Sequence, residues 1–127
     1  MSALVADFTG QRVGLPSERL LSLAEEISAR APGARVVETF NLTFAELLAS
    51  PSRNFGGERP TLPLCGDDTN AKIIVARLVE ECGLEPLAVG ALRMARSLET
   101  LATTWVQMAV VVDLFPAAPL RFCAVKP

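Results

Sequence analysis

The sequence contains no histidine and no tyrosine, and these absences narrow the chemistry that it can perform. Histidine is the usual general base at neutral pH and a common metal ligand, so we expect no zinc or haem centre and no Ser–His or Cys–His nucleophile. The three cysteines, Cys65, Cys82 and Cys123, are widely spaced and odd in number. This pattern is typical of reduced thiols in a cytoplasm and not of a disulfide framework. We therefore predict neither a metal nor a disulfide.

A dominant charge and a long apolar run are also missing. Twelve basic residues against fourteen acidic ones give a net charge of −2, and no basic patch indicates nucleic-acid binding. The opening residues, MSALVADF, lack the basic segment and apolar run of a secretion signal. The apolar run at residues 105–112 is too short to cross a bilayer. We expect a cytoplasmic protein without a nucleic-acid or membrane partner.

What the sequence does contain is an alternation of short apolar β-branched runs with helical patterns. We predict strands at residues 4–8, 36–40, 61–65 and 85–89, and a short last strand at 120–125. Helices are predicted to begin at Ser17, at Thr43 and at Asp67 or Asp68, with Gly83 ending the third. Pro63 lacks an amide hydrogen and indicates an edge strand or irregular pairing. Strands that alternate with helices favour a mostly parallel sheet, so we predict one α/β domain over residues 1–127.

The longest predicted helix covers residues 91–114 and carries two apolar stripes. The first stripe contains the interface residues named below. The second stripe runs beside it and consists of Leu92, Ala95, Ala102, Val106 and Ala109. A helix that is apolar on two faces must be covered on both. Its own domain covers one face, and the other face is covered either by another subunit or, in a plain core helix, by the rest of the core. We predict a homodimer with Trp105 as its anchor and an interface of Met94, Leu98, Leu101, Trp105, Met108 and Val112.

Polar residues follow the predicted strands, at the edge where open α/β sheets bind small molecules. The expected ligand-binding residues there are Thr9, Thr39, Cys65 and Asp67. Asn41 either orients a carbonyl or amide group of a ligand or is a simple turn asparagine. Cys65 either has a lowered pKa near a helix N-terminus or is a buried, inert thiol. Asp67 and Asp68 also have the alternative role of helix caps.

Glu99 is the least expected residue on the long helix, because it interrupts apolar stripes. A carboxylate in such a place must pair, face water or have a raised pKa. Arg96, one turn earlier, is the predicted partner. The two readings are a structural Arg96–Glu99 pair, or a catalytic group in which Glu99 and Asn41 act and Arg96 sets the charge of Glu99.

Three motifs in order resemble the NADP-dependent reductases related to the deazaflavin-coenzyme-dependent NADP oxidoreductase. They are VVETFN at residues 36–41, GGERPTLPLCGDD at 56–68 and ARSLETLATTWV at 95–106, and LVADFTG at 4–10 resembles the strand before them. The resemblance covers the second half of the family's protein and implies a truncated Rossmann-like parallel sheet with a long C-terminal helix. It also implies that Asn41 lies near the redox crevice and that the long helix pairs subunits. Gly10 stands where the family has asparagine.

No G-x-G-x-x-G fingerprint follows a predicted strand, so we expect no NADP and no other cofactor on this chain. Three functions remain open. The first, which we favour, is a small-molecule-binding biosynthetic enzyme that catalyses proton transfer, cyclisation or isomerisation without a cofactor. The second is an oxidoreductase component whose dinucleotide site lies on another chain. The third is a non-catalytic dimerisation module.

Overall fold

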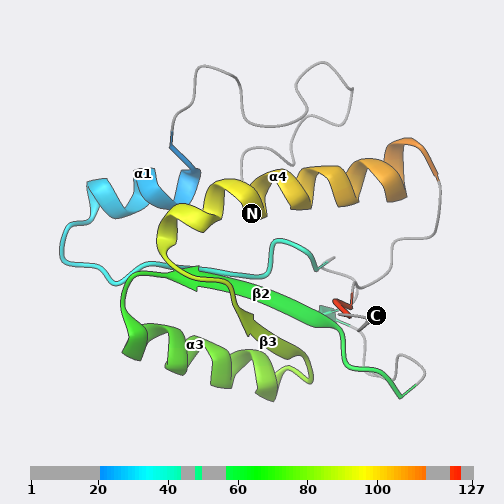
Figure 1. Ribbon diagram of the computed structural model, residues 1–127, viewed down its shortest axis with the longest axis horizontal. Helices are drawn as coiled ribbons and strands as arrows, with labels where there is room; N and C mark the ends of the chain where they lie inside the picture. The colour runs from blue at the N-terminus through cyan, green and yellow to red at the C-terminus, as the bar shows by residue number, and fades with distance from the viewer. Residues whose placement is uncertain (1–20, 44–47, 50–56, 114–120, 124–127) are drawn as a thin grey trace, which may run out of the picture.

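The computed structural model describes residues 21–43, 48–49, 57–113 and 121–123. These residues form an α/β fold with a long C-terminal helix, as predicted (Figure 1). A small sheet has α1 (Leu23–Arg30) and α4 (Ala95–Val106) on one face and α3 (Thr69–Glu81) on the other. The predicted strand at 4–8 and the predicted helix start at Ser17 lie outside the described residues.

The sheet is built around β2 (Thr61–Gly66), whose six residues are all buried. Its neighbours are β1 (Val37–Glu38) and β3 (Glu85–Ala88). β3 runs parallel to β2, in register from Thr61 opposite Glu85 to Leu64 opposite Ala88, whereas β1 runs antiparallel. The described sheet is therefore mixed. The prediction of parallel strands is correct for the β2–β3 pair and wrong for the β1–β2 pair. A run of β-branched residues predicts a strand but contains no information on its direction.

Pro63 lies in this central strand and pairs with Leu87 in the regular parallel register, so neither an edge strand nor an irregular pairing is found. The odd-numbered residues of β2 direct their backbone groups toward β1, since Leu64 and Gly66 are the ones that bond to the β3 side. β1 pairs only with Cys65 and Gly66 and has ended before Pro63. The missing amide hydrogen therefore removes no ladder bond. The carbonyl of Pro63 accepts a hydrogen bond from the Thr39 hydroxyl, 3.0 Å away.

The helix-capping residues explain where α1 and α3 begin. Asp68 caps α3 by accepting from the amide of Ala71 at 2.7 Å, and Gly83, with a φ of 80°, follows its last turn as predicted. The described start of α1 differs from the predicted one. Ser22 and Glu25 form a capping box there, so α1 begins at Leu23.

The long helix has three parts that follow one another without a break. A 3₁₀ turn, η2 (Leu92–Met94), leads into α4, which continues as a π-helical segment, η3 (Gln107–Val111). Three hydroxyl back-bonds, from Thr100, Thr103 and Thr104 to carbonyls four residues earlier, precede the π segment. The described helix ends at Val111, close to the predicted end.

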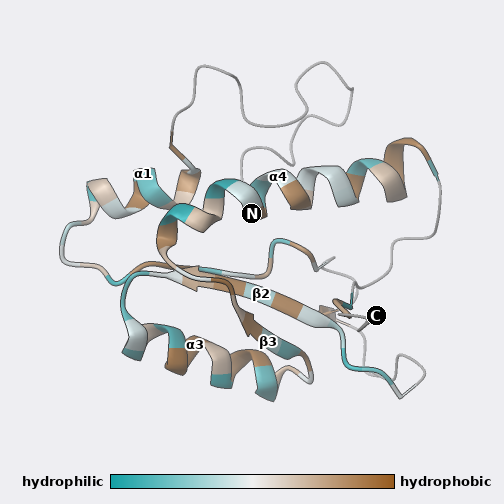
Figure 2. Cartoon of the chain, in the orientation of Figure 1, coloured by the Kyte–Doolittle hydropathy of each residue, from teal (hydrophilic) through white to brown (hydrophobic). Residues whose placement is uncertain are grey.

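Two apolar clusters hold the layers together, one on each face of the sheet. Figure 2 shows that β2, which lies between the layers, is largely hydrophobic. The cluster between the sheet and the α1–α4 layer contains Ala24, Cys65, Leu92, Ala95 and Leu98. The cluster under α3 contains Leu62, Val79 and Leu84, with Phe40, Leu48, Val75 and Cys82 against it. Side chains of β2 alternate between the two, as the period of a strand requires.

Two further expectations fall near the gaps in the described residues. Leu48 and Ala49 are helical, at the end of the helix predicted from Thr43. Arg121–Cys123 does not form a strand; instead, the amide of Phe122 donates to the Thr61 hydroxyl at 3.0 Å, and Arg121 forms an ion pair with Glu58. Within the described ranges, no helix is both long and apolar enough to span a membrane.

Candidate functional site

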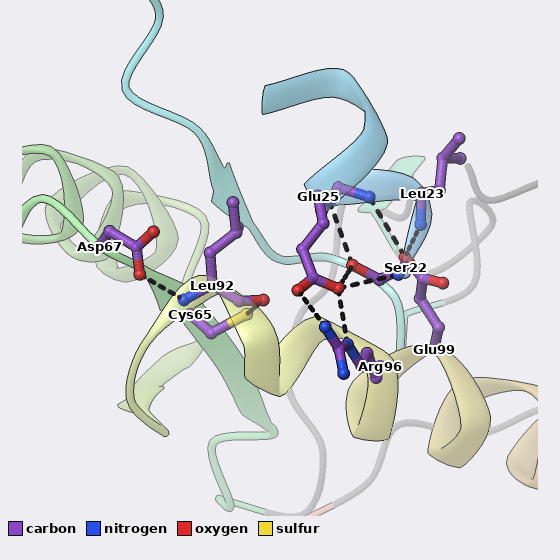
Figure 3. Close-up of polar contacts among 9 residues, drawn as sticks. Ser22, Leu23, Glu25, Cys65, Asp67, Leu92, Arg96 and Glu99 are labelled. Carbon is purple, nitrogen blue, oxygen red and sulfur yellow. Dashed lines mark hydrogen bonds and ion pairs between the residues drawn. The ribbon is translucent and has the colours of Figure 1, made fainter. Parts of the chain in front are cut away.

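The candidate site forms where α1, α4 and β1 meet, and Glu99 is at its centre. The Glu99 side chain extends from α4 to the start of α1 and is 1% exposed (Figure 3). Its Oε1 accepts hydrogen bonds from the amides of Leu23, at 3.0 Å, and Ala24, at 3.4 Å. These are free amides of the first turn of α1, where the helix dipole stabilises a negative charge. Glu99 therefore ties α4 to α1.

The predicted Arg96–Glu99 pair is absent, because Arg96 pairs with Glu25 of α1 instead. Its Nε and one terminal nitrogen donate to the two oxygens of Glu25, each at 2.8 Å. Glu25 also accepts from Ser22 in the capping box. The hydrogen bond from Arg96 is the main reason that the pKa of Glu25 falls to about 2. A residue one turn away was a reasonable partner, but the tertiary contact gives Arg96 a bidentate geometry that its own helix does not.

Glu38 of β1 is the important residue that the sequence analysis missed. Its half-buried carboxyl lies against that of Glu99, and its Oε1 accepts from Nδ2 of Asn41 at 2.9 Å. Burial, followed by the hydrogen bond and charge of Glu99, raises the pKa of Glu38 to about 8. A charged residue inside an otherwise apolar β-branched run, VVETF, was the signal that could have revealed it.

Asn41 and Glu99 are thus brought together, with Glu38 between them. A carboxyl that keeps its proton at neutral pH beside another carboxylate is the arrangement in which acid–base groups are commonly found. The group can donate a proton below its pKa and accept one above it. Arg96 is not in direct contact with either carboxyl of the pair; it acts on them only through Glu25 and the position of α1.

The other predicted ligand-binding residues do not gather at one edge. Because β1 is antiparallel to β2, the residues after β1 run back along β2, and Thr39 contacts Pro63 rather than the end of β2. At that end, Oδ1 of Asp67 accepts from the amide of Leu92 at 2.9 Å and so caps the start of the long helix. Thr9 lies outside the described residues.

Cys65 is an inert thiol in this structure. It is fully buried, with its sulfur 3.9 Å from the carbonyl oxygen of Leu92 (Figure 3). Burial, with the nearby charge of Glu38, raises the pKa of Cys65 to about 11. The alternative of a lowered pKa was wrong, because desolvation outweighs any effect of a helix N-terminus.

The predicted dimer residues divide into two groups. Leu98, 6% exposed, belongs to the core cluster, and half-buried Met94 packs against it. Trp105 and Met108 are half-buried, whereas Leu101 and Val112 are exposed, at 37% and 57%. The second stripe is the one that faces the domain, since Leu92, Ala95, Ala102 and Ala109 are all buried. An outward surface for a partner is therefore confined to the C-terminal part of the helix.

No group of three or more Cys, Asp or Glu side chains in the described part of the chain is arranged to hold a metal ion. Glu38 and Glu99 contribute two carboxyls, and Asn41 contributes its amide nitrogen, a donor, to Glu38. Such a cluster suits proton sharing better than metal binding.

Parts of several known proteins are similar to this chain in sequence or in structure. No protein-family model matches the sequence. Over 80 residues, which are 63% of this chain and 16% of the relative, the sequence is 35% identical to the metalloreductase STEAP3 of Rattus norvegicus. A solved structure from Arthrobacter sp. FB24, described as an F420-dependent NADP-reductase, matches 92% of this chain and 51% of its own, with a TM-score of 0.72 and 29% identity. A hypothetical protein of Sinorhizobium meliloti matches 57% of this chain and 35% of its own, with a TM-score of 0.50 and 34% identity.

The resemblance to NADP-dependent reductases is confirmed by these relatives, and so is the Rossmann-related α/β fold class. The chain spans about half the length of the Arthrobacter protein and 16% of the metalloreductase. The relation therefore concerns a part of each of these proteins.

Proposed function

Given this relation to NADP-dependent reductases, we propose that the chain is a component of such a reductase and that the dinucleotide site of this reductase lies outside these 127 residues. The observation that carries the proposal is the match to 51% of the Arthrobacter reductase at a TM-score of 0.72. The 127 residues contain no G-x-G-x-x-G fingerprint, which a Rossmann dinucleotide site uses to bring backbone close to the pyrophosphate. A part of the reductase fold without this turn functions as a reductase only together with a dinucleotide-binding part.

In this function the carboxyl pair supplies the proton that accompanies the hydride. Reduction of an organic acceptor by NADPH consumes one hydride and one proton. Glu38, with its pKa near 8, holds a proton that can be released near neutral pH, and Asn41 is the amide beside it that can orient a carbonyl of the acceptor. Glu99, beside Glu38, ties α4 to α1 through the Leu23 amide, and Arg96 holds α1 through Glu25.

The proposed assembly is a homodimer formed by the C-terminal part of the long helix. Exposed Leu101 and Val112 lie on the same stripe of this helix as the half-buried Trp105 and Met108. Clustered exposed apolar side chains on one helix are a common feature of subunit interfaces.

The experiment compares NADPH binding and oxidation with and without a dinucleotide-binding half. That half is taken from the Arthrobacter reductase, as the part that this chain does not match, and is added separately or fused in front of this chain. We expect the isolated chain to bind NADPH with a Kd weaker than about 10 µM, roughly −7 kcal/mol, and the fused protein to bind it and to reduce a deazaflavin or flavin acceptor.

Asn41→Ala in the fused protein should reduce turnover while leaving NADPH affinity unchanged, and Glu80→Gln, on the exposed surface of α3, is the matched control. Tight NADPH binding by the isolated chain, or NADPH binding without acceptor reduction in the fused protein, would contradict the proposal.

A second candidate is the cofactor-independent enzyme that catalyses proton transfer on a small molecule. The observation that favours it is the pKa of Glu38, which is near the value that suits a general acid–base at neutral pH. Turnover of a carbonyl substrate by the isolated chain, with an inflection near pH 8 that Glu38→Gln removes, would support this candidate over the reductase component.

A further inference from the structure

The pair of carboxyls leaves one buried oxygen atom, on Glu99, without a hydrogen bond. Oε1 of Glu99 accepts from two amides of α1, but Oε2 is buried and has no donor among the described residues. A buried carboxylate oxygen without a donor is costly, so such an atom requires an explanation. The neighbouring group is the Glu38 carboxyl, which can serve as a donor only when it is protonated.

The location of the proton follows from the surroundings of the two groups. Oε1 of Glu99 already accepts hydrogen bonds from two backbone amides of α1, and these amides can donate a proton but cannot accept one. Glu38 has one donor, the Asn41 side chain at 2.9 Å, and otherwise faces a carboxylate. Of the two, Glu38 is therefore the group that keeps the proton.

We propose that Glu38 donates a proton to the buried Glu99 carboxylate, and that this hydrogen bond is a pH-sensitive latch that holds β1 and the Phe40–Asn41 turn against α4. When the proton is lost, two adjacent carboxylates repel each other and the latch opens. The latch rests on the contacts within this chain and holds whether or not the proposed reductase function is correct.

None of the other charged and titratable groups around Glu38 takes over the role of this proton between the two carboxyls. In the described residues they are Glu99 of α4, Glu25 of α1 and the thiol of Cys65 on β2. Glu25 stays ionised, and its charge is balanced by the bidentate contact with Arg96. Lys72 of α3 donates to the carbonyl of Gly90, 3.4 Å away. Its charge acts against the rise in the pKa of the Cys65 thiol.

The element that moves when the latch opens is β1 rather than α1. The ion pair between Arg96 and Glu25 holds α1 on α4 and does not depend on Glu38. β1 has only two residues in its ladder with β2. The next residue but one, Phe40, has a φ of 64°, which is unfavourable for a residue with a side chain and persists only while its surroundings enforce it. Loss of the latch removes one of the contacts that enforce it.

Carboxyl ¹³C NMR of the whole chain between pH 5 and 10 tests the latch directly. We expect the Glu38 signal to titrate with a midpoint near 8, and the Asn41 side-chain amide signals to shift with the same midpoint. Backbone amides of β1 should lose protection from hydrogen exchange above that midpoint, after correction for the intrinsic pH dependence, while those of Leu23 and Ala24 keep theirs.

Two variants move the midpoint in opposite directions. Glu99→Gln places an amide donor beside Glu38 and removes a charge, so the midpoint should fall by at least one pH unit. Asn41→Ala removes the donor that favours ionised Glu38, so the midpoint should rise. A wild-type midpoint near 4.5, an unchanged midpoint in Asn41→Ala, or equal loss of protection in β1 and α1 would each overturn the proposal. Asn41→Ala keeps Glu99 and its contacts with α1, so the test does not depend on the folding of Glu99→Gln.

Discussion

Replacing Glu38 by glutamine should make the protein less sensitive to pH, because the amide imitates a carboxyl that never loses its proton. The introduced amide can donate to Glu99 and still accept from Asn41, as the protonated acid does. The pKa of Glu38 is raised in the folded state from 4.5 to about 8. A group of this kind stabilises the fold fully below its unfolded pKa, and this stability is lost as the pH rises toward the folded pKa.

The magnitude follows from the size of the shift. A change from 4.5 to 8 would correspond to about 5 kcal/mol at about 1.36 kcal/mol per pH unit if the group were wholly buried. Glu38 is only half-buried, so solvent screening reduces the expected effect to about 2 kcal/mol. Wild type and Glu38→Gln should therefore have similar free energies of unfolding at pH 5, and the variant should be about 2 kcal/mol more stable at pH 9.

Urea denaturation at unit steps from pH 5 to 9, followed by circular dichroism, measures this difference. Glu25 and Cys65 are present in both proteins, so the effects of their own shifted pKa values cancel in the difference between variant and wild type. Glu80→Gln, on the exposed surface of α3, is the matched control and should follow the wild type. A stability difference between Glu38→Gln and wild type that stays constant from pH 5 to 9, at equal m-values, would refute the reasoning.

Three further predictions concern packing, reactivity and assembly. Gly66→Ala should cost about 1–3 kcal/mol in urea denaturation, because its Cβ would lie 2.9 Å from the carbonyl oxygen of Val36; an unchanged midpoint would mean that the chain before β1 moves freely. A thiol reagent should label exposed Cys123 in the native protein and buried Cys65 only on unfolding, with rates that differ on the order of 100-fold or more; equal rates in mass spectrometry would contradict the burial. Sedimentation at tens of micromolar should give a dimer for wild type and a monomer for Leu101→Glu, and a wild-type monomer of 13.6 kDa would exclude the proposed assembly.

Local chemistry in the sequence was enough to predict most of the described fold. The cap at Asp68, the glycine at 83 and the strands around Leu64 and Leu87 follow from rules that involve neighbouring residues only. These features are correct because each depends on a few residues within one turn or one strand.

Features that depend on tertiary contacts could not be predicted in the same way. The direction of β1 is not encoded in its β-branched pattern, and this error placed Thr39 and Asn41 at the wrong end of β2. The pairing of Arg96 with Glu25 joins residues 71 positions apart and displaces the local pair that helix spacing favours. Glu99 was recognised as unusual from its apolar neighbours alone, but its partners on α1 and β1 were not.

The carboxyl pair is the place where the sequence departs most from what stability alone would favour. A leucine or methionine at position 38 would avoid the desolvation that raises the pKa of Glu38, and apolar replacements of buried charged groups are often neutral or stabilising. Glu99 accepts from the first amides of α1 without any help from Glu38, so the helix contact does not explain why β1 brings a second carboxyl to it. Local choices that work against the fold are expected mainly at functional or strained sites, and here the strained turn at Phe40 and the Asn41 amide lie beside the same pair. Glu38, rather than the more deeply buried Glu99, is therefore the residue whose chemistry should be tested first.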